Sequence, residues 1–201
     1  MQVGGVLGLD LDGTGISVGV WDEGPAQSTH VESAGTTGGS RVLVLDSGNL
    51  TETGPFNFHG THVSGTIAAK GLDPAAKGMA TNVNIRNYNF ANDSAEMLTA
   101  VTDPAIPIFL SNHSYGVPVG FYVSSSQEWV MGAYIEDSRT VDAIAFNNPK
   151  YLSVHSAGNN GNTTFNGQNF PGLDKLTGDK TGKNNLVIAS ANPSIVNGNL
   201  N

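Results

Sequence analysis

The sequence predicts an α/β fold of three layers, in which a mostly parallel central sheet has helices on both faces. Short apolar runs that suit strands recur along the chain. Between several of them, apolar residues fall at helical spacing with start and stop signals. Strands that alternate with helices form parallel sheets, because each helix crosses one face of the sheet. We expect strands at 16–21, 42–45, 83–88, 106–110, 151–156 and 186–189, and helices at 60–69, 93–101 and 127–147.

Composition excludes several classes of function. The 201 residues suffice for one α/β domain with a sizeable core. The net charge of −8 comes without a cluster of Lys or Arg, so we expect neither a nucleic-acid partner nor a membrane partner. The absence of cysteine excludes a thiol nucleophile and cysteine-bound zinc. No apolar run approaches the roughly 18 residues that a membrane-spanning helix needs.

The first expected strand ends at a carboxylate. Residues 16–21 are apolar on both faces, as in a central parallel strand, and Asp22 follows directly. Functional groups in open α/β sheets gather just beyond the carboxyl ends of the strands, which makes Asp22 a candidate site residue. Asp46 follows the next expected strand, at 42–45, and is a second candidate for the same position.

Two further carboxylates support a different hypothesis. The run from Asp10 through Asp12 to Thr14 resembles the nucleophile loop of haloacid-dehalogenase-type phosphatases, and 7–22 resembles the first phosphate-binding hairpin of actin-like sugar kinases. Either chemistry needs acidic Mg²⁺ ligands and further phosphate loops. No second Gly-rich loop follows, so we favour a Gly/Asp turn that leads into a strand.

A helix of small residues is expected to begin directly after His59. Val63 and Ile67 stand four apart and share one face of it. The helix has no charged stripe, which predicts burial between layers, and its two glycines indicate close backbone packing at a cost of about 1 kcal/mol each. We expect His62 to be a core histidine. His59 and His62 lack a third ligand at a metal-binding spacing, so no metal site is predicted.

Two more expected strands lead into polar segments. The run 106–110, which Pro107 interrupts, leads to Ser114, Tyr115 and Gly116. The run 151–156 leads to Ala157, Gly158 and Asn159, and is followed by a polar stretch, 165–184, that we expect to be a surface loop. We expect His113, just after the strand at 106–110, to be a structural residue. We also expect Trp129, Met131 and Tyr134 to lie in the core, and Ser138 to be a cap within the helix at 127–147.

Taken together, these motifs resemble the subtilisin-like serine peptidases, from about Gly13 to Ala191. The resemblance rests on His-Gly-Thr-His-Val at His59, strand-Asp-x-Gly at Asp22, Ser-Tyr-Gly at 114–116 and Ala-Gly-Asn-x-Gly at 157–161. It implies that His59 is the general base and that Asn159 stabilises the oxyanion. It also implies that Ser114, Tyr115, Gly116, Ala157 and Gly158 bind an extended peptide.

Spacing within the resemblance selects Asp22 as the catalytic aspartate. The family places a strand between its aspartate and its histidine, and only Asp22, 37 positions before His59, leaves room for one. Asp46 precedes His59 by 13 positions, although its Asp-Ser-Gly matches the motif better locally. Glu23 stands where relatives usually carry Ser or Thr, and Thr81 stands where they carry Pro.

The nucleophile motif of the family is missing. No Gly-Thr-Ser-Met-Ala run occurs, and Ser190 and Ser194 come too soon after Asn159. The resemblance therefore implies that residues 1–201 form a partial catalytic domain, incomplete at its C-terminus and inactive alone, with the rest of that domain as its partner. The complete protein would be a secreted serine endopeptidase, and the alternative is a non-catalytic remnant that binds peptides. Calcium is possible by resemblance, but 70–77 offers only Asp73, so no cofactor site is identified.

Overall fold

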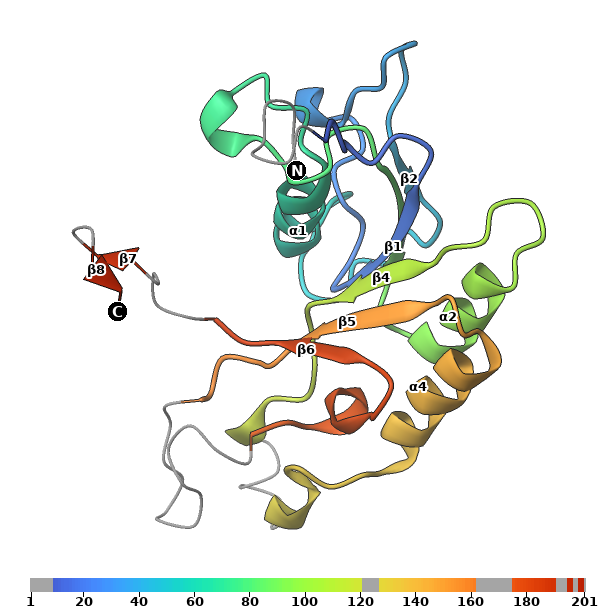
Figure 1. Cartoon of the computed structure of the whole chain (residues 1–201), viewed down its shortest axis with the longest axis vertical. Coiled ribbons are helices and arrows are strands. Elements are labelled where there is room, and N and C mark those ends of the chain that lie inside the picture. Colours follow the sequence, from blue (N-terminus) through green and yellow to red (C-terminus); the bar gives the residue numbers. More distant parts are fainter. Residues whose placement is uncertain (1–8, 121–126, 162–174, 191–194, 197–198, 201) are drawn as a thin grey trace.

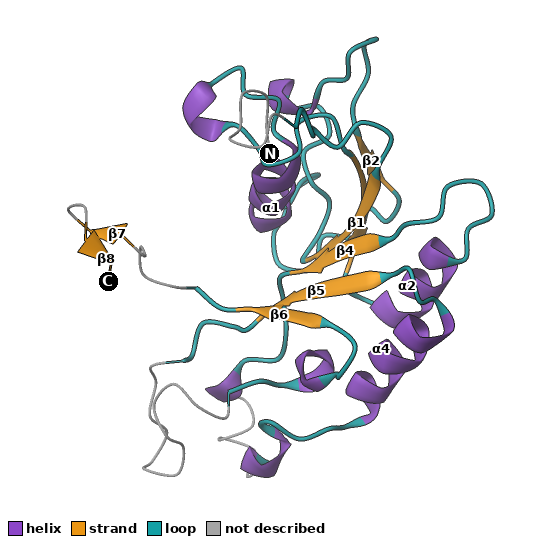
Figure 2. Ribbon diagram, in the orientation of Figure 1, coloured by secondary structure: helices purple, strands orange, loops and turns teal. Residues whose placement is uncertain are grey.

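The structure is a computed structural model that describes residues 9–120, 127–161, 175–190, 195–196 and 199–200. Expectations that fall on 1–8, 165–174 or Ser194 lie outside these residues. The main sheet has six strands in the order β2-β3-β1-β4-β5-β6, and every neighbouring pair is parallel (Figure 2). The strands are β1 (Ser17–Asp22), β2 (Val42–Val44), β3 (Asn84–Asn89), β4 (Leu110–His113), β5 (Leu152–Ser156) and β6 (Leu186–Ile188).

Helices cover both faces of the sheet, as predicted. Helix α1 (Phe58–Ala68) lies on one side, and α2 (Asp93–Val101) and α4 (Glu136–Asn147) lie on the other (Figure 1). Each face has its own apolar cluster: Val20 and Ile85 meet Ala68 of α1, whereas Trp21 packs with residues of α2 and α4. The short elements are η1 (Val31–Ser33), η2 (Pro74–Ala76), η3 (Glu128–Val130), η4 (Gly178–Thr181), and an antiparallel pair of β7 (Ile195–Val196) and β8 (Asn199–Leu200).

A row of four stacked rings crosses the centre of the sheet. Tyr88 of β3, Trp21 of β1, His113 of β4 and His155 of β5 are register partners on adjacent strands. Successive ring centroids lie 4.3, 5.2 and 4.5 Å apart, with interplanar angles of 3°, 11° and 13°. Side chains of one row in a parallel sheet point to the same face at about the interstrand spacing, so planar rings can stack there.

Two elements differ from their predicted positions. The strand expected at 106–110 is displaced to Leu110–His113, because Pro107 has no N–H to donate to a sheet. The helix expected over 127–147 begins only at Glu136, after Gly132 in a left-handed conformation (φ +79°). Met131 is buried as expected, but Trp129 and Tyr134 are 68% and 41% exposed, so their assignment to the core was wrong.

Helix α1 begins two residues earlier than expected and places His59 inside its first turn. The side chain of Asn57 caps the helix by accepting the N–H of Gly60 at 2.8 Å. Only a stripe of small residues, Gly60, Ser64 and Ala68, is buried, because these side chains let the helix approach the sheet closely. His62 lies on the exposed side, so the predictions of a helix buried between layers and of a core His62 were wrong.

The two glycines of α1 provide a matched test of this packing. A Cβ on Gly60 would lie 2.7 Å from the carbonyl oxygen of Gly24, whereas a Cβ on Gly65 would meet no atom within 4 Å. We expect Gly60→Ala to lower the free energy of unfolding by about 1–3 kcal/mol through overpacking. Gly65→Ala should raise it by up to about 1 kcal/mol through helix propensity. Urea denaturation of both variants measures this, and equal effects would contradict the packing described.

Candidate active site

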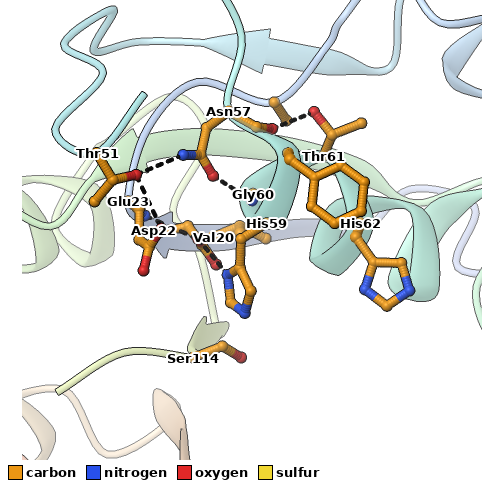
Figure 3. A network of polar contacts seen from close by, with 12 residues as sticks. Val20, Asp22, Glu23, Thr51, Asn57, His59, Gly60, Thr61, His62 and Ser114 are labelled. Carbon is orange, nitrogen blue, oxygen red and sulfur yellow. Dashed lines mark hydrogen bonds and ion pairs between the residues drawn. The ribbon is translucent and has the colours of Figure 1, made fainter. Parts of the chain in front are cut away.

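Asp22 and His59 meet at the carboxyl end of β1. The Nδ1 atom of His59 lies 2.6 Å from Oδ1 of Asp22, and that same oxygen accepts the backbone N–H of Glu23 at 2.8 Å (Figure 3). Asp22 is fully buried, whereas 44% of the His59 side chain is exposed. A buried carboxylate that contacts Nδ1 fixes the orientation of an imidazole and leaves Nε2 to exchange protons.

The surroundings of Asp22 perturb its ionisation. Burial raises its pKa, and the contact with His59 together with the hydrogen bond from Glu23 partly opposes this. Its second oxygen, Oδ2, has no hydrogen-bond partner among the described residues. The carboxylate of Glu23 accepts a hydrogen bond from the Thr51 hydroxyl at 3.0 Å.

The predicted substrate segments and Asn159 lie around one pocket with a volume of about 960 Å³. It is lined by His59 from α1, by 114–116 beyond β4, and by 157–159 beyond β5. Asp22 lies next to Nδ1 of the His59 ring, and Ser114 lies on the opposite side of that ring (Figure 3). The four motifs therefore converge at one edge of the sheet.

The competing carboxylates lie elsewhere. Asp46 accepts the backbone N–H of Gly48 at 3.2 Å, as in an ordinary turn, and is not among the described residues that line the pocket. Asp12 accepts the N–H of Thr14 at 2.9 Å and the side-chain amide of Asn82 at 2.7 Å. Asp10 and Asp12 precede the start of β1, whereas Asp22 is its last residue, so they lie at the opposite end of the strand.

A chain of buried hydrogen bonds supports the wall of the pocket at Tyr115. The Tyr115 hydroxyl donates to Asp93 at 2.6 Å, so it accepts from Nδ1 of His113 at 2.9 Å. Nε2 of His113 then accepts from the hydroxyl of Ser111 at 2.7 Å. Burial lowers the pKa of His113 well below 6.5 and raises the pKa of Tyr115 well above 10.0, so both side chains stay neutral near pH 7.

The polar sequence after residue 174 did not indicate that this segment would be buried at the pocket. The part of the predicted surface loop at 165–174 lies outside the described residues, but Lys175, Thr177, Gly178 and Lys180 are buried and line the pocket. The expectation of an exposed loop was wrong there, because polar contacts dock this segment onto α4. The Ser138 hydroxyl donates to the carbonyl of Gly178 at 2.9 Å, and it also accepts the N–H of Ile135, which is the predicted capping role.

The model of the subtilase family matches residues 13–195. The chain belongs to the subtilase family. This subtilase chain is 27% identical over 201 residues to the serine protease/ABC transporter B family protein tagA of Dictyostelium discoideum, covering 93% of the chain and 10% of that protein. It is 32% identical over 105 residues to an Aeromonas sobria extracellular serine protease, covering 47% of the chain and 17% of that protein.

A solved structure shows the same fold. The Clostridium perfringens CspB protease matches this subtilase chain with a TM-score of 0.52 at 23% identity, over 76% of the chain and 37% of that protease. The chain thus spans less than half the length of each of these three proteins.

The loop at 70–77, which was considered for calcium, surrounds a carboxylate of the chain itself. Its backbone N–H groups at Gly71, Leu72 and Asp73 donate to the carboxylate of Glu32 at 2.7–3.1 Å. Calcium requires six to eight oxygen ligands, whereas this turn directs donors at a carboxylate. Within the described ranges, no group of three or more His, Asp or Glu could hold a metal ion. Those ranges also contain no helix long and apolar enough to span a bilayer.

The buried His113 predicts a pH-dependent stability. Its pKa in the folded chain lies below the reference value of 6.5, so the unfolded chain binds more protons as the pH falls through 6.5. The stabilisation is therefore present above pH 6.5, and we expect it to decline by up to about 1.4 kcal/mol per pH unit below it. Urea denaturation at several pH values should show a smaller decline for His113→Asn than for the exposed control His62→Asn. Equal slopes would contradict the prediction.

Proposed function

We propose that this chain supplies the acid–base pair, an oxyanion donor and the peptide groove of a serine endopeptidase. The observation that carries the proposal is the 2.6 Å contact between the buried Asp22 and His59, at a pocket that Asn159 also lines. Such a pair can activate a serine hydroxyl, because the imidazole accepts the hydroxyl proton while the carboxylate stabilises the resulting imidazolium.

The proposed mechanism gives each group one role. His59 takes the proton from a serine in the C-terminal part of the same catalytic domain, beyond residues 1–201, and delivers it to the leaving amine. Asp22 holds His59 in position, and the Asn159 amide donates to the oxyanion. The substrate extends as an added strand along Ser114, Tyr115 and Gly116 on one side and Ala157 and Gly158 on the other. We propose that this part alone is inactive, because it lacks the nucleophile.

Two relatives named as serine proteases support this function, and one of them is named as extracellular. We therefore propose a secreted enzyme that cleaves peptide or protein substrates. A peptide-binding remnant would keep the same groove and lack catalysis. A phosphotransferase has no support, because Asp12 is engaged in a turn away from the pocket.

The first test is proteolysis by the protein at the full length that its gene encodes. We expect digestion of casein that a serine-directed covalent inhibitor abolishes. His59→Ala should reduce kcat/KM by at least roughly 10³-fold, since removal of a triad member eliminates most of the catalysis. His62→Ala, three residues along α1 on its exposed side, is the matched control. Undiminished cleavage by His59→Ala would refute the peptidase, and peptide binding without cleavage would identify a remnant.

The oxyanion role of Asn159 predicts a specific kinetic signature. Asn159→Ala should lower kcat by about 10²–10³-fold and leave KM nearly unchanged, because the interaction forms only in the transition state. This magnitude is transferred from subtilisin, where loss of such a donor was measured. Asn147→Ala, on the exposed side of α4, should retain full activity. An Asn159→Ala enzyme that loses affinity instead of kcat would assign this side chain to substrate binding.

A further inference from the structure

A buried lysine, Lys180, lies at the pocket. Lys180 belongs to η4 and is 4% exposed, yet it lines the same pocket as His59. Its ammonium has no hydrogen-bond or ion-pair partner within the part of the chain that the structure describes. Lysine is almost never this buried without a counter-ion, because removing an ammonium from water is costly. Burial accordingly lowers the pKa of Lys180, and Asp179 partly opposes this.

The ammonium of Lys180 rests against the proposed substrate strand. A Cβ on Gly116 would overlap Nζ of Lys180, so this position has room for the lysine only because it lacks a side chain. Gly116 also has φ +154°, a backbone conformation that other residues rarely adopt. Nζ therefore lies beside the backbone along which the peptide is proposed to extend.

The Asp179 carboxylate attracts the ammonium of Lys180, but no carboxylate among the described residues forms an ion pair with it. The Asp179 carboxylate lies 2.8 Å from Nδ1 of His155, and Asp93 accepts the Tyr115 hydroxyl. Asp137 is exposed, with no ion pair to a lysine among the described residues. The same pocket is lined by a second buried lysine, Lys175, and by four acidic residues, Glu23, Asp93, Asp137 and Asp179. Because none of these carboxylates forms an ion pair with Lys180 among the described residues, an anionic group that enters the pocket could pair with its ammonium.

We propose that Lys180 is a specificity-determining residue that makes the pocket select a substrate side chain bearing a carboxylate, glutamate or aspartate. This inference rests on the proposed function, since it assigns a side-chain class to that same groove. The carboxylate would accept a charge-assisted hydrogen bond from Nζ, which is among the stronger polar contacts in a desolvated site. A neutral or basic side chain would leave the ammonium unpaired, and a basic one would also repel it.

The test compares three hexapeptides, Ala-Ala-Tyr-Xaa-Ala-Ala, in which Xaa is Glu, Gln or Lys. Their binding to the ¹⁵N-labelled chain is followed by NMR at Gly116 and Gly178, in physiological salt so that distant surface charges are screened. Glu and Gln differ in charge and scarcely in shape. We expect the Glu peptide to bind roughly 10- to 100-fold more tightly than the Gln peptide, the range given by a hydrogen bond to a charged group. Lys180→Met should remove the difference, and the exposed control Lys150→Met should keep it.

Each outcome decides the proposal. Equal binding of the Glu and Gln peptides, a preference for the Lys peptide, or no shift at Gly116 with millimolar Glu peptide would overturn it. Retention of the Glu preference by Lys180→Met would overturn it as well. Failure of the proposed function has a different signature: the full-length protein would not digest casein, while the Glu preference and its dependence on Lys180 would persist.

Discussion

The stack of Tyr88, Trp21, His113 and His155 is the constraint on which the rest of the structure depends. The four rings belong to one row of register partners, so they hold β3, β1, β4 and β5 at matching heights. Asp22, Ser114 and Ser156 follow Trp21, His113 and His155 directly in the sequence. Alignment of the ring row therefore aligns the residues that follow it. The candidate site is thus a consequence of strand register, because a shift of one residue would turn Asp22 toward the opposite face.

Successive side chains of β1 point to opposite faces of the sheet, so neighbouring residues have different surroundings. Trp21 packs toward α2 and α4, whereas Asp22 shares the face of Val20, where α1 delivers His59. The small residues of α1 also help to bring His59 to Asp22. The close approach of Gly60 to the Gly24 carbonyl sets the distance between the helix and the end of the strand. A buried carboxylate in such surroundings is stabilised by few contacts, which is why the His59 ring and one backbone N–H matter to its ionisation.

The features that could be predicted from the sequence are those that depend on local residue patterns. Hydrophobic runs located the strands, and the motif at His59 together with its spacing from Asp22 selected two side chains that the fold brings to 2.6 Å. The exposure of Trp129 and the start of α4 were beyond such reasoning, because apolar residues around Gly132 resemble a helix face until tertiary contacts decide. Lys180 was missed for the opposite reason: a polar stretch predicts a loop, and only contacts distant in sequence bury it.

Different helices position His59 and the segment that carries Lys180. Asp22 and His59 depend on β1 and α1, which pack on one face of the sheet. The segment that carries Lys180 depends on α4, on the other face, through Ser138 and through Asp142, whose carboxylate accepts the N–H groups of Lys183 and Asn184 at 2.8 Å. The two parts are nevertheless in contact, because Trp21 of β1 packs in one apolar cluster with Val141 and Ile144 of α4. Asp179 of η4 also contacts His155, which belongs to the same ring stack as Trp21.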